Sequence, residues 1–460
     1  MKVLNKAWSE KGWMIVSFII YHLSFSPAGA QQLWTLDECM DYAIAHSSEM
    51  AHRQYEQKRH EVKAQASRDA RLPRLSGDLG AYTGTLRHSG DHHRLDADMS
   101  VLGVGVSAAV PLYTGSRLSS QIKADKYSLL ASIEDVRHAE KNLRIQVAAA
   151  YLQVLYNKGE AEIARQRLEV SQLLQTRAQS LFDKGKRPES DVAEAAAMVS
   201  RDEALLVAAE GETELSKLDL RQLLNLPDSV DFDIAEPDDN PSPRTPVPPY
   251  TISPSHPAIL SSGYTIQQAE QEVKVARSGY YPTLSLVGEL GTLWASLDTR
   301  AKHDGQVPLV SPWGSFGSLS YHFSLDSEWK RKNFLHAIVG LKLSIPIFNA
   351  FETRAHIRTA KVNLMDAQLA YDDTRQQLQK DIRQAWQEAV TARKRYEAEV
   401  KAETACSLSY QYVLKRYEAG MATLFDLSQS RQQWFTATEN ALRMKYEYII
   451  REKILEIKVQ

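Results

Sequence analysis

The chain carries an internal duplication that keeps a single register over about eighty residues. The motif Val-Pro-Leu-Tyr at residues 110–113 recurs 235 residues later as Ile-Pro-Ile-Phe at 345–348. The same spacing pairs Phe-Asp-Lys-Gly at 182–185 with Tyr-Glu-Ala-Gly at 417–420. Because a repeat of this length is the unit from which a repeat architecture is built, we expect both halves to contain the same elements in the same order.

The duplication also sets the expected domain organisation. The first structural repeat is predicted over residues 31–226 and the second over 257–460. Between them, residues 227–256 form a proline-rich segment that indicates a linker or an irregular subdomain, because proline removes backbone donors. The second half has 26 more residues between its two equivalent prolines, Pro282 and Pro346, than the first has between Pro73 and Pro111, which predicts a longer loop there.

The amino-terminal residues 1–30 have the pattern of a secretory signal peptide. Three lysines precede an apolar run over residues 13–25, and Ala28-Gly29-Ala30 supplies the small residues of a cleavage site. The apolar run is too short to span a bilayer, so a retained anchor is the less favoured alternative. The 55 basic and 57 acidic residues are evenly mixed, which argues against nucleic acid as a partner. Whether the two cysteines, Cys39 and Cys406, form a disulfide is left open.

Long helices are predicted in each half. In the first, apolar residues recur with heptad spacing and no proline interrupts the segment, so residues 117–182 are expected to form one helix of about 100 Å. Its repeat is expected over 352–418. Each long helix is predicted to turn back into a shorter one, at 189–224 and 423–457. Two further helices are expected, one following the capping box Thr35-Leu36-Asp37-Glu38 to about residue 70 and one over 257–280.

Strands of roughly ten residues precede each long helix. Apolar residues alternate with polar or small ones over 335–347 and 102–110, with weaker partners at 75–83 and 283–294. Four strands cannot close a barrel, and an open edge in lipid leaves unpaired backbone groups. Three copies give a twelve-stranded barrel, although eight strands from a dimer also close and a soluble sheet is the other alternative.

The segments 417–427 and 182–192, together with the strand end at 343–348, resemble the TolC-like outer-membrane efflux protein family over essentially the whole mature chain. The resemblance implies a mainly α protein with a membrane β part, in which long antiparallel α-helical hairpins form a periplasmic tunnel and a trimer supplies the twelve-stranded barrel. It also implies a passive exit duct for small molecules in the outer membrane of a Gram-negative bacterium. The expected partners are two further copies, a periplasmic adaptor, an inner-membrane transporter and outer-membrane lipid.

The two turns between long and short helices are the candidate functional site. Glycine at each turn permits a backbone reversal that is costly for other residues. By resemblance, the turns are adaptor-docking tips and lie beside a constricted periplasmic entrance; Asp191 and Asp426 have an alternative role as helix caps. Tyr417 matches a latch tyrosine of the family, but Ala422 stands where the family carries its basic partner. The tip residues are Gly185, Lys186, Gly420, Met421 and Thr423, and the entrance residues are Asp191, Glu194, Tyr417, Asp426 and Gln429.

The sequence contains no motif for a catalytic nucleophile, a phosphate-binding loop or a zinc protease, so neither an enzyme nor a cofactor is predicted. A cluster of histidines and aspartates over residues 88–96 is interpreted as a solvated loop rather than a metal site. Two alternative functions are kept. One is a type I protein-secretion duct of the same fold, and the other is a periplasmic coiled-coil scaffold that forms no channel.

Overall fold

The protein is described here by a computed structural model covering residues 33–90, 93–227, 230, 232–236, 254–299 and 332–459. The predicted signal peptide and most of the proline-rich segment lie outside these residues. The chain divides into two compact units, and both halves of the sequence contribute to each. We call them the sheet unit, residues 56–134 and 258–374, and the hairpin unit, residues 1–55, 135–257 and 375–460.

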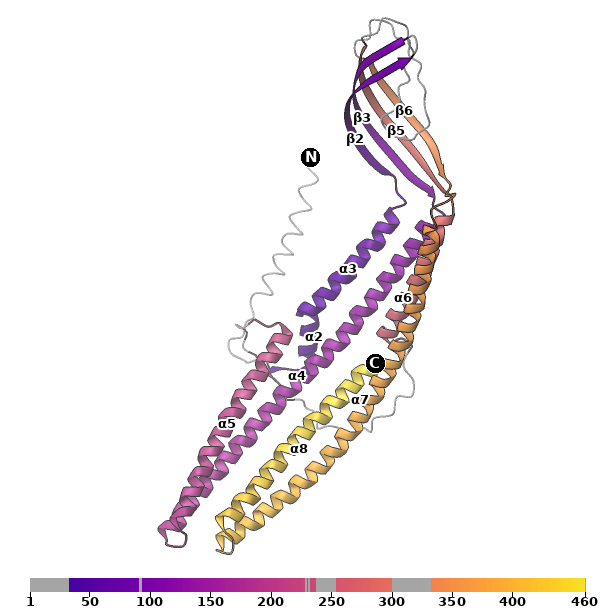
Figure 1. Cartoon of the computed structure of the whole chain (residues 1–460). Coiled ribbons are helices and arrows are strands. Elements are labelled where there is room, and N and C mark those ends of the chain that lie inside the picture. The colour runs from indigo at the N-terminus through magenta and orange to yellow at the C-terminus, as the bar shows by residue number, and fades with distance from the viewer. Residues whose placement is uncertain are drawn as a thin grey trace, which may run out of the picture. The chain divides into compact units, whose positions relative to one another are not determined.

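The sheet unit contains one antiparallel sheet made of two strands from each half, as the sequence predicts (Figure 1). Its strands, in the order in which they pair, are β2 (Arg74–Gly90), β3 (His93–Tyr113), β5 (Thr283–Thr299) and β6 (Lys332–Ser344). With 17, 21, 17 and 13 residues, all four exceed the predicted length of about ten. The prediction was wrong because the strands continue into polar residues, where hydrophobic alternation gives no signal.

The last strand also ends earlier than predicted, at Ser344 rather than near residue 347. The partner strand explains the difference, because β5 begins at Thr283, which pairs with Ser344, and no described strand residue lies opposite residues 345–347. The two faces of the sheet differ sharply, because alternate residues point to opposite sides. One face carries large exposed apolar side chains and the other carries polar ones. The apolar face includes Leu79, Val104, Leu290 and Val339, and the polar face includes Ser76, Ser107, Glu289 and Lys342.

The passage from strand to long helix has the same backbone conformation in both halves. Gly115 and Ser116 have positive φ angles of 59° and 68°, and Ala350 and Phe351, 235 residues later, have 49° and 63°. Left-handed backbone is costly for a residue with a side chain, and most of all for a bulky one. The turn is therefore more strained in the second half, where Ala350 and Phe351 both carry side chains, than in the first, where one of its two residues is Gly115.

The four predicted long helices are present, and the sequence located their ends to within two residues. They are α4 (Arg117–Asp183), α5 (Glu189–Leu224), α7 (Glu352–Glu418) and α8 (Leu424–Val459). Helices α4 and α5 form the first hairpin, and α7 and α8 form the second (Figure 1). Among the described residues, no helix is long and apolar enough to cross a membrane.

The first helical segment differs from the prediction because it is broken. The capping box at Thr35 and Glu38 begins α2 (Leu36–His46) as predicted. Ser47 is then extended, and its hydroxyl accepts a 3.2 Å hydrogen bond from the Glu49 amide at the start of α3 (Ser48–Asp69). A serine that caps a new helix stops the old one. The helix before the second pair of strands is α6 (Pro257–Arg277), which ends in the single turn η1 (Ser278–Tyr280).

The described part of the proline-rich segment is attached to the hairpin unit. Two short strands, β1 (Leu33–Trp34) and β4 (Asp233–Ile234), pair in parallel. The Tyr151 hydroxyl on α4 lies 2.5 Å from the Ala235 carbonyl oxygen and 3.0 Å from that of Trp34. Lys158 pairs with Asp233 at 2.5 Å. These contacts attach residues 232–236 to α4.

Candidate entrance site at the hairpin turns

Both hairpin turns are closed by the same hydrogen-bond pattern. In the first, the amide of Gly185 donates to Phe182 (2.7 Å) and that of Lys186 to Leu181 (2.9 Å). In the second, the amides of Gly420 and Met421 donate to Tyr417 (3.0 Å) and Arg416 (2.8 Å). This is the glycine-terminated helix end in which the last carbonyls are satisfied by the reversing chain, and both glycines have positive φ.

Asp426 has the capping role that the sequence left as an alternative. The amide and the hydroxyl of Thr423 donate to its Oδ2 at 2.9 and 2.7 Å, and the Asp426 amide donates to the Thr423 hydroxyl at 3.1 Å. The backbone hydrogen bond from Thr423, followed by the one from its side chain, holds the pKa of Asp426 below its usual value. Asp426 and Gln429 are both exposed. The carboxylate is therefore ionised and oriented at a free surface of the hairpin.

Tyr417 is almost completely buried, and a cation from the other hairpin lies against it. The guanidinium carbon of Arg187 is 4.7 Å from the centre of the Tyr417 ring, within the range of a cation–π contact. The same guanidinium donates to the carbonyl oxygen of Ala422 at 2.7 Å and to that of Tyr417 at 3.4 Å. One side chain of the first turn thereby binds both the ring and the backbone of the second turn.

Asp191 and Glu194, in the first turns of α5, lie near the buried phenol. Burial raises the pKa of Tyr417, and the negative charge of Asp191 raises it further, while Arg187 opposes this effect. The Tyr417 hydroxyl and Oδ2 of Asp191 are both buried without a hydrogen-bond partner among the described residues. Of the five predicted entrance residues, Asp191 and Glu194 lie near Tyr417 together with Arg187, whereas the described hydrogen bonds of Asp426 are with Thr423.

Arg187 is the candidate site residue that the sequence prediction did not indicate. The basic partner was sought at residue 422, where the family carries it, and only alanine is found there. The duplication contained the signal, because residue 187 plus the repeat spacing of 235 is residue 422. Arg187 lies at the position of the first half that is equivalent to Ala422 in the second half, so the repeat spacing of 235 residues identifies it.

The predicted docking tips present apolar side chains to solvent. Gly185, Lys186, Gly420, Met421 and Thr423 are all exposed at the turns. Around them, the side chains of Met421 and Phe425 are 67% and 66% exposed, and Phe182 is 38% exposed. Exposed apolar groups on two adjacent hairpin ends are typical of a surface that another protein covers.

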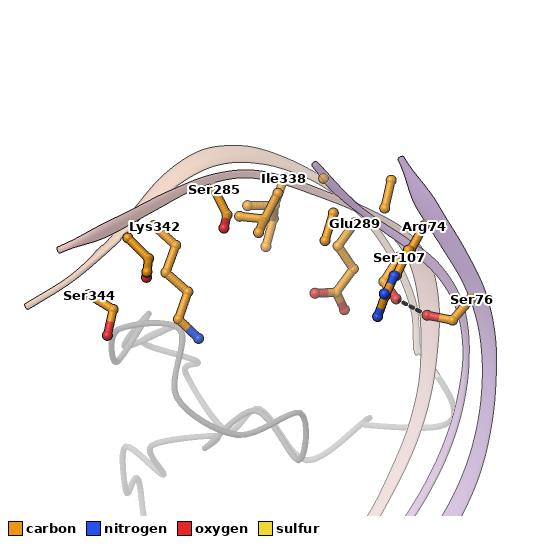
Figure 2. A pocket seen from close by; sticks show the side chains of 13 residues that line it. Arg74, Ser76, Ser107, Ser285, Glu289, Ile338, Lys342 and Ser344 are labelled. Carbon is orange, nitrogen blue, oxygen red and sulfur yellow. Dashed lines mark hydrogen bonds between the residues drawn. The ribbon is translucent and has the colours of Figure 1, made fainter. Parts of the chain in front are cut away.

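The sheet unit has a concave surface on its polar face. A concavity of about 480 Å³ is lined by residues from all four strands, and Figure 2 shows Arg74, Glu289 and Lys342 directed into it. The Ser76 and Ser107 hydroxyls hydrogen bond at 2.7 Å, and His336 lies 3.2 Å from Glu289. Charged and hydroxyl groups on this face are suited to line a wet interior, opposite the apolar face.

The two cysteines form no disulfide, and no metal site is found among the described residues. Cys39 and Cys406 are both free, and burial raises the pKa of the Cys39 thiol to about 12. The loop predicted over residues 88–96 is wrong for the backbone, because His88 belongs to β2 and residues 93–96 belong to β3; the side chains of this segment lie outside the described residues. Within the part of the chain that the structure describes, no group of three histidine, cysteine or acidic side chains is placed to hold a metal ion.

The sequence profile of the family described as "Outer membrane efflux protein" matches residues 40–226 and 250–456. The chain is 25% identical over 326 residues to the outer membrane efflux protein BepC of Brucella suis, covering 70% of this chain and 64% of that protein. It is 22% identical over 353 residues to the alkaline protease secretion protein AprF of Pseudomonas aeruginosa, covering 75% of this chain and 66% of AprF. In both cases the chain spans slightly less than two thirds of the relative's length.

The fold is similar to that of solved channel proteins. A crystal structure of CusC, described in terms of transmembrane channel formation, superposes with a TM-score of 0.75 at 17% identity and covers 95% of each chain. At that level of identity the likeness concerns the fold. The mainly helical architecture with a four-stranded β part, predicted from the resemblance, is thereby confirmed.

Proposed function

Because the chain belongs to the outer membrane efflux protein family, we propose that three copies form the exit duct of a tripartite efflux system. The duct is passive, and small molecules leave the cell through it, with the energy supplied by an inner-membrane transporter. A periplasmic adaptor links that transporter to the hairpin turns. The chain is an outer-membrane protein with a periplasmic helical part, and it is not an enzyme.

The two-faced sheet carries the proposal. Its strands expose apolar side chains on one face and polar ones on the other, as a barrel with lipid outside and water inside requires. The 13 residues of β6 extend about 44 Å, and a tilt of about 40° gives a height of about 34 Å, enough for an apolar band of about 25 Å. In the described sheet, β2 and β6 each have one unpaired edge, and pairing between copies removes these edges.

At the entrance we assign two roles to the predicted residues. Threefold repetition brings three Asp426 carboxylates and three Gln429 side chains around one axis, which creates a constriction that favours cations. The cluster of Tyr417, Asp191, Glu194 and Arg187 holds the two turns of each copy together behind that ring. The exposed tips, with Gly185, Lys186, Gly420, Met421 and Thr423, are the surface that the adaptor covers.

A planar bilayer experiment tests the duct. Purified mature protein is added to one side, and single-channel currents are recorded with and without multivalent cations. We expect discrete conductance steps of one size, blocked by multivalent cations from the periplasmic side. Protein that binds the bilayer without any conductance step contradicts the proposal and favours the scaffold that forms no channel.

A protein-secretion duct is the second candidate, and the similarity to AprF supports it. Both functions use the same fold, so the cargo distinguishes them. A deletion strain that accumulates small toxic compounds but secretes its proteins normally supports efflux. A strain that loses a secreted protein and keeps its drug tolerance supports secretion.

A further inference from the structure

A layer of charged side chains is buried in the hairpin unit between two apolar cores. The upper core includes Leu143, Val147, Leu220 and Tyr446, and the lower one, near the turns, includes Leu174, Met198, Tyr417 and Leu427. Between them lie Arg167 of α4, Asp202 of α5 and Arg431 of α8, which are 8%, 2% and 5% exposed. We call these three residues the charged layer.

Asp202 is the centre of the charged layer. Arg167 donates from Nε to its Oδ1 at 3.1 Å, and Arg431 donates from Nη1 to its Oδ2 at 2.7 Å. The Nη1 group of Arg431 also donates to the Arg167 carbonyl oxygen at 3.3 Å. Since Asp202 belongs to the first hairpin and Arg431 to the second, one carboxylate joins both hairpins.

Further contacts fix the layer along α8. Arg167 donates to Glu439 at 3.1 Å and also to the side-chain oxygen of Gln432. Both guanidinium carbons lie within 6 Å of the buried Phe435 ring, at 5.6 Å for Arg167 and 5.9 Å for Arg431. One donor, Nε of Arg431, is left without a partner among the described residues. These hydrogen bonds and ring contacts form together at only one axial position of α8.

The apolar residues of α8 do not by themselves select that position. Leu427, Trp434, Ala441, Tyr448 and Leu455 recur every seven residues, so sliding α8 by one heptad, about 10 Å, returns an apolar group to most of these places. A short turn fixes α4 against α5, but more than two hundred residues separate Asp202 from Arg431. A slide would leave Asp202 buried without Arg431, and an unpaired buried charge is strongly unfavourable.

From this geometry we infer that Asp202, Arg167 and Arg431 are positioning residues that set the axial register of the second hairpin on the first. The register brings Arg187 to Tyr417 and Ala422, so the consequence for the entrance rests on the proposed function. The axial register itself is a property of the hairpin unit and does not depend on the proposed function. The charged layer gives up some stability for a unique alignment, as polar residues do in coiled coils.

Engineered disulfides measure the register directly. A Cβ added at Gly159 of α4 would lie 3.4 Å from Cγ of Leu442 on α8, so Gly159→Cys with Leu442→Cys reports the native register. Gly159→Cys with Ile449→Cys reports a slide of one heptad and leaves the Phe435 ring of the charged layer in place. The full-length chain carries Cys406→Ser throughout, and an intrachain cross-link is identified by mass.

Each pair is examined with the layer intact, with Asp202→Asn, and with the apolar triple variant Arg167→Met/Asp202→Leu/Arg431→Met. With the layer intact, we expect the 159–442 cross-link only. In the triple variant we expect thermal stability equal to or above wild type, at least a twofold loss of that cross-link, and appearance of a slid one. If the triple variant does not fold, Asp202→Asn is the test variant, and we expect it to show the same loss of the 159–442 cross-link.

The exposed pair Arg165 and Glu210, 3.2 Å apart within the first hairpin, provides the matched control. Arg165→Gln/Glu210→Gln removes two charges at the same level without touching α8, and we expect the cross-links to be unchanged. A triple variant or Asp202→Asn protein with the wild-type cross-link pattern overturns the inference. A protein that conducts no ions yet changes register as expected contradicts the proposed function and leaves the inference standing.

Discussion

The guanidinium carbon of Arg187, on the turn of the first hairpin, lies 4.7 Å from the centre of the Tyr417 ring, at the end of the second. The two residues belong to different copies of the repeat, and Arg187 occupies the position that Ala422 occupies in the other copy. The contact thus joins the two hairpin ends of a single chain.

Arg187→Ala is expected to loosen the entrance. The change removes a cation–π contact, of about 1–2 kcal/mol where desolvated, and a hydrogen bond to the Ala422 carbonyl oxygen. Single-channel recordings are expected to show a larger conductance, or more time in the open state, than wild type. Conductance and open time that both match wild type would remove Arg187 from the entrance.

Two variants control for a general loss of packing. Arg187→Ala/Ala422→Arg returns the cation to the other half, and we expect it to restore part of the closed state. Tyr417→Phe keeps the ring below Arg187 and removes a buried hydroxyl without a partner among the described residues. Its conductance is therefore expected to equal that of wild type.

The charge and the cap of Asp426 can be separated by mutation. Asp426→Asn removes the charge and keeps a side chain that can cap α8, so cation block is expected to weaken several-fold. Thr423→Ala removes the capping partner and keeps the charge, so cation block is expected to remain. Equal block in wild type and Asp426→Asn would mean that Asp426 only caps its helix.

The pH dependence of that block follows from the direction of the pKa shift. The hydrogen bonds from Thr423 lower the pKa of Asp426 from its ordinary value of 3.8. A lowered pKa keeps the carboxylate ionised at neutral pH and down to about pH 5. Cation block is expected to be constant over that range and to disappear only in stronger acid, which bilayer recordings at stepped pH can measure. Loss of block between pH 7 and 5 would contradict this assignment.

Ala350→Gly is expected to stabilise the protein by about 1 kcal/mol, because glycine adopts a φ of 49° without strain. The matched opposite change is Gly115→Ala at the equivalent position of the first half. A Cβ there would lie 2.6 Å from Cβ of Tyr281, so that variant is expected to be destabilised. Thermal denaturation in detergent compares them. A lower melting temperature for Ala350→Gly would contradict the account of the strained turn.

His256 is expected to make the hairpin unit sensitive to acid. Burial, then the positive charges of Lys141 and His138, lowers its pKa from 6.5 to about 4. A lowered histidine pKa means that the unfolded chain binds the extra proton first. Its contribution to the free energy of unfolding is complete above about pH 6.5 and falls progressively toward pH 4. His256→Gln is expected to flatten the stability profile measured by denaturant titration, and an unchanged profile would exclude His256.

Much of the fold could be predicted because the same signals occur twice. Glycines at 185 and 420 mark both turns, and the repeat register relates the ends of α4 and α5 to those of α7 and α8. The ends of α4, α5, α7 and α8 therefore agreed with the prediction within two residues. The break at Ser47 was missed, because one serine between two helix-forming segments gives no clear signal in sequence.

The candidate site was less accessible to sequence reasoning, because its contacts join residues far apart in the chain. Arg187 meets Tyr417 across 230 residues, and Asp202 meets Arg431 across 229. Neither pair has a local spacing that could reveal it. The sequence placed Asp426 near the start of a helix, where it lies in the first turn of α8. Its hydrogen bonds with Thr423 depend on side-chain geometry, which spacing alone does not define.

The mass of the mature protein in detergent tests the central claim most directly. The proposed duct requires three copies, because the four strands of one chain form an open sheet, and we propose that neighbouring copies close its two edges. Native mass spectrometry or light scattering with the detergent subtracted is expected to give three times the mass of the mature chain. A monomer, or a dimer with eight strands, would contradict the proposed duct.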